Sequence, residues 1–323
     1  FSISLRSIYT LFATILLTNF TVLPDAYGFS ISSNQNILGK MTHITTRHGD
    51  GTITVSPKNE AAQSATIVIC HGLGDSSDGF ADVAEHLSRE MPHVKFILPT
   101  APTQPVTMNM GMSMPSWYDI VGLDEQSNSK AKGIMESRDR VRSILKAENE
   151  RGVSYSRMVL AGFSQGAALS LFTGLQLEAS QKLAGVLVLS GYLAGVSQFE
   201  MTSGLESTPI FHCHGTEDPL VQYKMAEKTK QMLLSKGVSN YTLQAYPIQH
   251  TVVPEEIRDS LQFLKGILPN DDSVCVKVKD PSEMSVKELK AAIKNAGLGS
   301  KAVGLMEKQE FVKLLQDFRK GSK

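Results

Sequence analysis

Short apolar runs alternate with longer amphipathic segments between residues 66 and 267. The apolar runs are rich in β-branched residues and predict strands at 66–70, 94–98, 157–161, 185–189, 209–213 and 241–246. The amphipathic segments predict helices near 79–90, 131–150, 165–178, 222–236 and 254–267. Runs that are apolar on both faces and separated by helices are typical of a parallel sheet buried between helices. The pattern therefore predicts an α/β domain over residues 50–269, with a mostly parallel sheet covered by helices on both faces.

The alternation stops after Pro269, and the rest of the chain has the pattern of a linker, at 270–280, followed by two helices. Ser285 and Glu288 have the spacing of a capping box at the start of the first helix. Apolar residues then recur at helical spacing, at Val286, Leu289, Ile293 and Ala296 in the first helix and at Phe311, Leu314, Leu315 and Phe318 in the second. We therefore expect a small helix-loop-helix module at 281–323.

The amino-terminal residues have the pattern of a targeting sequence. Residues 8–23 are apolar, and this stretch is shorter than the roughly 20 residues that span a bilayer, so we interpret 1–28 as a signal-peptide-like leader. Small residues precede Phe29 as they would precede a cleavage site, and 29–49 lacks acidic residues, as a transit peptide or a linker does. We expect entry into the secretory pathway, leading to the ER, secretion or a secondary plastid. The alternative is a cytoplasmic protein whose translation starts at Met41.

Charge and composition exclude several classes of protein. The 323 residues carry 32 Lys and Arg against 32 Asp and Glu, so the formal net charge is zero. Residues 270–323 carry 11 basic and 8 acidic side chains, which is a mild excess. Capture of nucleic acid or anionic lipid by bulk charge is therefore not expected, and we expect no nucleic-acid partner.

Metal binding is not expected either. Cys70, Cys213 and Cys275 are too few and too scattered for a zinc site or a disulfide framework, and the first two lie in apolar runs as buried side chains would. His212 and His214 could form a metal-binding pair, but no third ligand completes the set. We therefore interpret these two histidines as buried or turn-stabilising residues.

Candidate chemistry begins with a serine between two glycines. Gly162, Ser164 and Gly166 form a G-x-S-x-G pattern between the predicted strand 157–161 and a segment of small residues that starts a helix. A nucleophile at such a strand-to-helix turn has a strained backbone, and the glycines on either side prevent Cβ clashes. The pattern predicts Ser164 as a nucleophile.

A nucleophilic serine needs a base, and the base needs a third group to orient it. In hydrolases with this sheet architecture the chain order is serine, then Asp or Glu, then histidine. Asp218 follows the predicted strand 209–213, and His250 follows the predicted strand 241–246. We therefore predict a triad of Ser164, Asp218 and His250.

An acyl-transfer site also needs backbone N–H groups to bind the oxyanion. Gln165, directly after the nucleophile, would supply one N–H group. The second would come from Leu73, in a glycine-containing loop that follows the first predicted strand. An ordinary strand-to-helix turn is the alternative interpretation of that loop.

These motifs together resemble the acyl-protein thioesterase/carboxylesterase family of serine hydrolases over about residues 50–268. The resemblance rests on HGLGD (71–75), PTAPTQPVTMNMGMSMPSWYD (99–119), GFSQGAALS (162–170), HGTEDPLV (214–221) and YPIQH (246–250). It implies an α/β-hydrolase fold and the roles already assigned to the triad and the two amides, with no cofactor. Two positions depart from the family pattern, because Ala167 stands where the family often has Gly and Gln249 stands where Gly commonly precedes the histidine.

The segment 99–119 is the candidate lining for the substrate. Its methionines alternate with Asn, Gly and Ser ahead of the single Trp of the chain. Flexible thioethers beside an indole ring would form an adaptable apolar wall for an acyl chain. We assign Met112, Met114 and Trp117 to that wall. The alternative is that these side chains pack a long loop onto the core.

The expected function is hydrolysis of acyl thioesters or carboxylic esters through an acyl-enzyme, of the type that removes fatty acyl groups from proteins. The alternative is a carboxylesterase or lysophospholipase acting on small esters or lipids. A third hypothesis, from another class, is an inactive hydrolase fold that serves as a binding scaffold. Residues 298–315 resemble SAP-like helix-loop-helix modules, and the partner of this module is unknown from the sequence.

Overall fold

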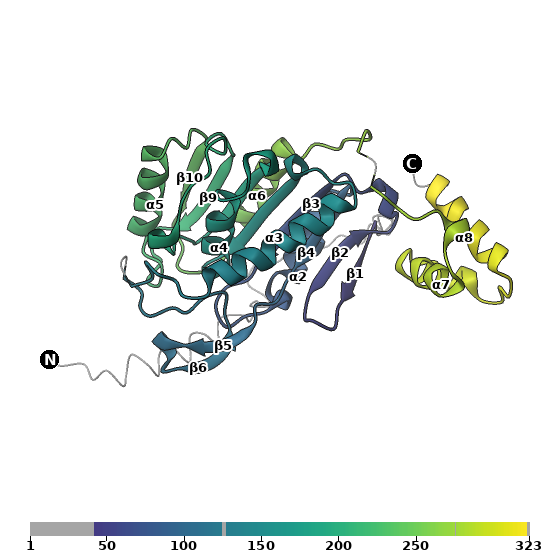
Figure 1. Ribbon diagram of the computed structural model, residues 1–323, viewed down its shortest axis with the longest axis horizontal. Coiled ribbons are helices and arrows are strands. Elements are labelled where there is room, and N and C mark those ends of the chain that lie inside the picture. Colours follow the sequence, from purple (N-terminus) through teal and green to yellow (C-terminus); the bar gives the residue numbers. More distant parts are fainter. Residues whose placement is uncertain (1–41, 125–126, 275, 322–323) are drawn as a thin grey trace, which may run out of the picture. The chain divides into compact units, whose positions relative to one another are not determined.

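The computed structural model of the protein describes residues 42–124, 127–274 and 276–321 (Figure 1). The leader predicted at 1–28 lies outside the described residues, so entry into the secretory pathway stays a prediction. Within the described ranges, no helix combines the length and the apolar character needed to cross a membrane.

The core of the fold is a sheet of eight strands. Their order across the sheet is β1 (His43–Arg47), β2 (Ile53–Pro57), β4 (Val94–Leu98), β3 (Ala65–Cys70), β7 (Met158–Phe163), β8 (Gly185–Leu189), β9 (Ile210–Gly215) and β10 (Tyr241–Tyr246). From β4 to β10 neighbouring strands are parallel, whereas β1 pairs with β2 and β2 pairs with β4 in antiparallel fashion. The predicted α/β architecture with a mostly parallel sheet is confirmed.

The six strands predicted from apolar runs are the six parallel strands of this sheet, with ends that differ by at most two residues. The edge strand β1 corrects one prediction, because residues 43–47 belong to the segment 29–49 that we interpreted as transit-like or linker. The sequence HITTR of β1 is polar, and its side chains are half-buried or exposed. A short polar strand at the edge of a sheet does not have the apolar pattern by which buried strands are recognised.

Five helices cover the sheet: α2 (Ala81–Glu90), α3 (Ile134–Glu150), α4 (Gln165–Gly174), α5 (Tyr223–Ser235) and α6 (Pro254–Ile267). One hydrophobic core packs α3, α4 and α5 against the sheet, and a second core packs α2 and α6 against the opposite face. Strand β3 supplies both cores in alternation, with Val68 and Cys70 in the first and Ile67 and Ile69 in the second. Figure 1 shows α3 and α4 crossing one face of the sheet.

A separate hairpin of two strands, β5 (Thr103–Val106) and β6 (Met112–Pro115), lies in the methionine-rich segment. The amide of Gly74 donates a hydrogen bond to the carbonyl of Pro115 at 2.8 Å. The hairpin is therefore attached to the loop that follows β3, which is the loop expected to bind the oxyanion.

The carboxy-terminal residues form two helices, α7 (Val286–Asn295) and α8 (Lys308–Gly321), with a small core of their own. The predicted capping box is confirmed, because the Glu288 amide donates to Ser285 Oγ and the Ser285 amide donates to the Glu288 carboxylate. Val286 is 40% exposed and does not contribute to the core, unlike the other apolar positions predicted for α7. In the preceding segment, Val276 packs on the core that contains α3.

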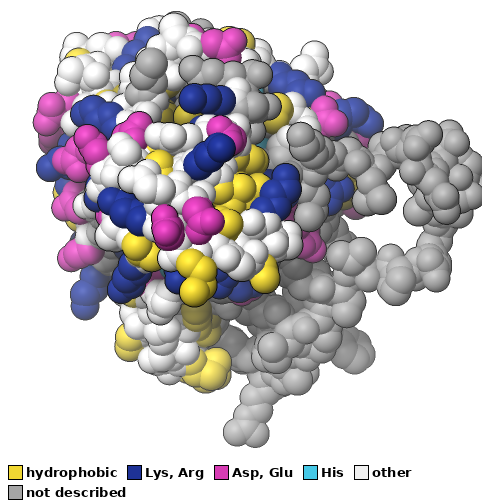
Figure 2. Space-filling view, turned by 90° about the vertical axis from the view of Figure 1, so that its right-hand side faces the viewer, with side chains coloured by type: hydrophobic (Ala, Val, Ile, Leu, Met, Phe, Trp, Pro, Cys, Tyr) yellow, Lys and Arg dark blue, Asp and Glu magenta, His cyan; other side chains and the backbone are white. Residues whose placement is uncertain are grey.

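Charges of both signs are mixed on one face of the molecule. Figure 2 shows Lys and Arg side chains there, interspersed with Asp and Glu side chains. Positive and negative side chains are therefore neighbours on this face.

Candidate active site

The backbone at Ser164 is strained. Ser164 lies between the end of β7 and the first residue of α4, with φ +53° and ψ −115°. L-residues other than Gly rarely adopt a positive φ, and such strain persists where the surrounding structure imposes it. The predicted strand-turn-helix context of this serine is thus present, and the turn raises its side chain above the end of the sheet.

The glycines on either side of Ser164 are required by close approach. A Cβ atom on Gly162 would lie 2.4 Å from the Gly166 carbonyl, and one on Gly166 would lie 2.1 Å from the Cys70 carbonyl oxygen. Neither space can hold a methyl group. Because Cys70 ends β3, the turn is packed directly against the strand that leads into the expected oxyanion loop.

The structure brings the three predicted triad residues into one hydrogen-bonded series. His250 Nδ1 donates to Asp218 Oδ2 at 2.6 Å, and Ser164 Oγ donates to His250 Nε2 at 2.9 Å. The Phe163 ring lies 4.8 Å from the His250 ring, centroid to centroid, and covers one side of the imidazole. The three side chains therefore have the mutual geometry that nucleophilic catalysis by a serine requires.

Backbone amides bind the carboxylate oxygen of Asp218 that does not face His250. Its Oδ1 atom accepts hydrogen bonds from the amides of Leu220 and Val221, each at 2.8 Å. The Asp218 side chain is fully buried, whereas the His250 side chain is 12% exposed. The other oxygen, Oδ2, is thereby directed at the imidazole.

The loop after β3 lies beside the nucleophile. A Cβ atom on Gly72 would be 3.6 Å from Ser164 Cβ, which brings the adjoining Leu73 close to the reacting centre. The N–H of Gln165 is the first in α4, where helix N–H groups have no partner within the helix. Gln165 therefore lies at the turn that carries Ser164, and Leu73 lies in the loop packed against that turn.

His71 is a structural residue of this loop to which the sequence pattern assigned no role. Its Nε2 atom accepts from the Ala101 amide at 2.9 Å, and its Nδ1 atom donates to the Gly72 carbonyl at 2.7 Å. Its own carbonyl accepts from Trp117 Nε1 at 2.8 Å. Burial lowers the pKa of His71, which is consistent with the neutral form that this pattern of one donor and one acceptor needs.

The side chain of Gln165 is a second feature that sequence reasoning missed. This side chain is buried, its Oε1 atom accepts from the Trp117 amide, and its Nε2 atom donates to Ser116 Oγ and to the Tyr118 carbonyl. The residue after the nucleophile therefore ties the turn to the segment 116–118. A glutamine at this position was visible in the sequence, but its three partners lie 47 to 49 residues away along the chain.

The structure divides the three residues predicted to line the substrate site. Met112 is 54% exposed on β6, and Met114 is half-buried, with its Sδ atom 3.7 Å from the position of a Cβ on Gly74. Trp117 is fully buried and donates its indole N–H to the His71 carbonyl. The assignment of Trp117 to the lining is wrong, because its side chain is fully buried and hydrogen-bonded to the loop that follows β3, so it presents no surface to a substrate.

The buried cysteines do not compete with Ser164 as nucleophiles. Cys70 and Cys213 are fully buried, as predicted, and burial raises the pKa of each thiol to about 12. A thiol, unlike a thiolate, is a poor nucleophile. Cys275 lies outside the described residues. Among the described residues, no group of three or more His, Cys, Asp or Glu side chains could hold a metal ion.

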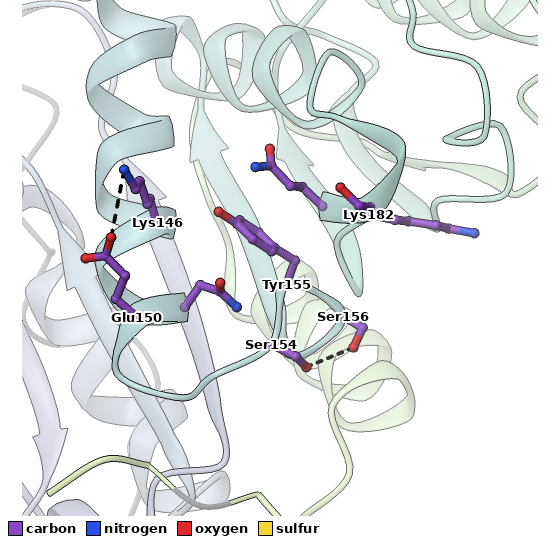
Figure 3. Close-up of a pocket in the computed structure, with 9 residues that line it drawn as sticks. Lys146, Glu150, Ser154, Tyr155, Ser156 and Lys182 are labelled. Atoms are coloured by element: carbon purple, nitrogen blue, oxygen red, sulfur yellow. Dashed lines mark hydrogen bonds and ion pairs between the residues drawn. The ribbon is translucent and has the colours of Figure 1, made fainter.

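A hollow of about 640 Å³ lies away from this site (Figure 3). It is lined by polar residues near the end of α3 and before β7 and β8, including Lys146, Tyr155 and Lys182. The hollow is therefore at the amino ends of parallel strands whose carboxyl ends form the site at Ser164. Ligands of open α/β sheets bind at the carboxyl ends, so the hollow does not belong to the site at Ser164.

Comparison with known proteins agrees with this geometry. The phospholipase/carboxylesterase family matches residues 50–268. The acyl-protein thioesterase 1 of Mycosarcoma maydis is 39% identical over 236 residues, which cover 68% of this chain and 97% of that protein. The acyl-protein thioesterase 1 homolog 1 of Dictyostelium discoideum is 36% identical over 214 residues, covering 66% of this chain and 94% of that protein. The crystal structure of Zea mays acyl-protein thioesterase 2 superposes with a TM-score of 0.59 at 29% identity, covering 67% of this chain and 98% of that one.

Methyl groups at the two glycines test the strained turn. We expect Gly162→Ala and Gly166→Ala to lower the free energy of unfolding by about 1–3 kcal/mol, because each Cβ meets backbone atoms. We also expect esterase kcat/KM to fall roughly 100-fold, because displacing the turn by an ångström misplaces the nucleophile. Denaturant unfolding and steady-state kinetics measure the two effects.

Gly266→Ala is the matched control. Gly266 lies within α6, and a Cβ there would have no neighbour within 4 Å. Since alanine favours a helix interior over glycine, this change should stabilise the fold by about 0.5–1 kcal/mol and leave the kinetics unchanged. Equal effects of all three substitutions would contradict a special requirement at the turn.

Proposed function

The chain belongs to the phospholipase/carboxylesterase family and is a serine hydrolase of esters or thioesters, and we propose that it removes acyl groups through Ser164, His250 and Asp218. The observation that carries the proposal is the series of short hydrogen bonds from the Asp218 carboxylate through the imidazole to the Ser164 hydroxyl. A serine hydroxyl becomes nucleophilic when an oriented base accepts its proton, and this series supplies both the base and its orientation.

The first half-reaction transfers the acyl group to the enzyme. Ser164 Oγ attacks the carbonyl carbon of the substrate while its proton moves to His250 Nε2. The imidazolium so formed is stabilised by Asp218 Oδ2 on its other nitrogen. The carbonyl oxygen takes up negative charge, which the amides of Leu73 and Gln165 would stabilise. The tetrahedral adduct then collapses, the bond to the leaving sulfur or oxygen breaks, and His250 Nε2–H protonates the leaving thiol or alcohol, which completes the first half-reaction.

The second half-reaction returns the enzyme to its starting state. Water then attacks the acyl-Ser164 ester and gives its proton to His250. Collapse of this second adduct releases the carboxylic acid and restores the serine hydroxyl. All of these steps use groups of this chain and of water.

We propose a fatty acyl thioester on protein cysteine as the substrate. Relatives that match about two thirds of this chain, among them those of Mycosarcoma maydis and Neurospora crassa, are named acyl-protein thioesterases. Leu73 and Met114 present apolar, half-buried surface beside the nucleophile turn, and the exposed Met112 extends it. Such a surface suits an acyl chain. Activity on small esters or on lysophospholipids is the alternative outcome of the substrate comparison below.

Removal of the nucleophile tests the proposed mechanism. Ser164→Ala should lower kcat by at least about 10⁴-fold and abolish labelling by a fluorophosphonate, because the reacting hydroxyl is gone. Ser154→Ala, in the distant hollow, is the control and should keep both properties. A folded wild-type chain that is never labelled would instead support the binding-scaffold hypothesis.

A comparison of substrates with long and short acyl chains tests whether Met114 lines the acyl site. Met114→Ser should raise KM for a palmitoyl-thioester peptide about 10-fold and leave KM for an acetyl thioester unchanged, because only the long chain reaches the lost apolar surface. Met306→Ser is the matched control, since Met306 is 89% exposed in the carboxy-terminal module. An equal effect on both substrates would remove Met114 from the lining. A wild-type preference for short p-nitrophenyl esters would favour the carboxylesterase alternative.

A further inference from the structure

Behind the Asp218 loop, three buried side chains form a continuous hydrogen-bonded series. The Tyr241 hydroxyl lies 2.6 Å from His212 Nδ1, His212 Nε2 lies 3.1 Å from His214 Nδ1, and His214 Nε2 lies 2.7 Å from the Val221 carbonyl oxygen. Both histidines are fully buried and Tyr241 is 9% exposed. His212 and His214 are two residues apart on β9, so their side chains lie on the same face of the sheet. Tyr241 contacts His212 from the neighbouring strand β10.

The direction of this series follows from its last acceptor. A carbonyl oxygen only accepts, so His214 Nε2 carries a hydrogen. In a neutral imidazole the other nitrogen, Nδ1, then accepts from His212 Nε2–H. By the same rule His212 Nδ1 accepts from the Tyr241 hydroxyl. Burial lowers the pKa of both histidines, in agreement with the neutral forms that this order requires.

The series ends on the residue that holds the triad carboxylate. The Val221 carbonyl accepts from His214, and the Val221 amide donates to Asp218 Oδ1. His214 Nε2 also lies 3.7 Å from Asp218 Oδ2, the oxygen that binds His250, and both side chains are fully buried. The charge on His214 therefore bears directly on the carboxylate that orients the base.

We propose that Tyr241 and His212 keep His214 uncharged and in one tautomer, so that the Asp218 carboxylate is left to act on His250 alone. His214 is thus a positioning residue, and this role rests on the triad proposed above. A second proton on His214, at Nδ1, would face the hydrogen on His212 Nε2, so neither nitrogen could accept a hydrogen bond from the other. His212 would have to move its own proton to Nδ1, and the Tyr241 hydroxyl would have to give up the bond that it donates. After these changes both His212 nitrogens are still paired, but the Tyr241 hydroxyl hydrogen has lost its acceptor, which opposes protonation of His214.

A charged His214 would compete with the base for Asp218. The ionisable groups that face His214 are Asp218 from the loop after β9, His250 from the loop after β10, His212 on its own strand and Tyr223 on α5, whose ring lies 6.0 Å away. Asp218 is the anion among them. A positive charge on His214, whose Nε2 lies 3.7 Å from Asp218 Oδ2, would attract the carboxylate. The carboxylate would then stabilise the His250 imidazolium less strongly in the transition state.

Tyr241→Phe tests the proposal by removing the hydroxyl at the start of the series. The two tautomers of His212 then become closer in energy, so His214 takes up a proton more easily as the pH falls. We expect kcat/KM relative to wild type to be within about 2-fold at pH 8 and about 10-fold lower at pH 6, with KM for the substrate unchanged. The acid limb of the Tyr241→Phe profile should show an ionisation that the wild-type profile lacks.

Tyr246→Phe is the matched control. Tyr246 is on the same strand, but its side chain is on the opposite face and its hydroxyl donates to Asp259. This variant should keep the wild-type shape of the pH profile. In the double variant Tyr241→Phe with His214→Gln, the activity ratio to wild type should no longer depend on pH, because the residue that takes up the extra proton is absent. A Tyr241→Phe profile of wild-type shape, or a pH dependence that persists in the double variant, would overturn the proposal.

The wild-type protein supplies a test that needs no substitution. Long-range ¹H–¹⁵N correlation spectra of the histidine side chains should show His212 and His214 as neutral Nε2–H tautomers between about pH 6 and pH 8. A His214 that titrates within this range, or that carries its hydrogen on Nδ1, would overturn the series. Fluorophosphonate labelling separates the two proposals. An unlabelled wild type removes the triad, whereas a labelled wild type with a titrating His214 removes only the role of His214.

Discussion

The strained turn at Ser164 is the constraint on which the arrangement of the site depends. Its positive φ lifts the hydroxyl off the end of β7, and the turn fits only because two glycines leave room for neighbouring backbone. The same close packing brings the loop after β3 against the turn. The fold stores strain at this residue and holds it with a fully buried helix, α4, directly behind it.

Two buried, neutral histidine side chains, those of His71 and His214, fix the positions of the loops around the site. His71 joins the oxyanion loop to the chain after β4, and His214 joins β9 to the loop that carries Asp218. Each has one donor and one acceptor nitrogen satisfied by defined partners, so burial costs little and the orientation is unique. His250 differs from both, because its side chain retains access to solvent and one of its nitrogens faces the nucleophile. The same residue type thus positions loops where it is enclosed, and where it is open it is the residue that we propose as the base.

Sequence patterns predicted the parallel strands and the triad for a common physical reason. Strands such as β8 are apolar on both faces, and residues such as Asp218 follow the ends of such strands, where parallel topology brings them together. β1 was missed because an edge strand can be polar. Trp117 was misassigned because an irregular segment has no periodicity to indicate which side chain faces inward. Tyr241 on β10 contacts His212 on the neighbouring strand β9 diagonally, and no local sequence pattern indicates such a contact.

Trapping the acyl-enzyme would test directly whether Ser164 carries the acyl group during turnover. The purified chain would be mixed with a palmitoyl-thioester peptide, quenched in acid within the first turnover and digested for mass spectrometry. We expect one palmitoyl group, attached through an ester to Ser164. An acyl group on any other residue, or free fatty acid released without any acylated intermediate under these conditions, would contradict it.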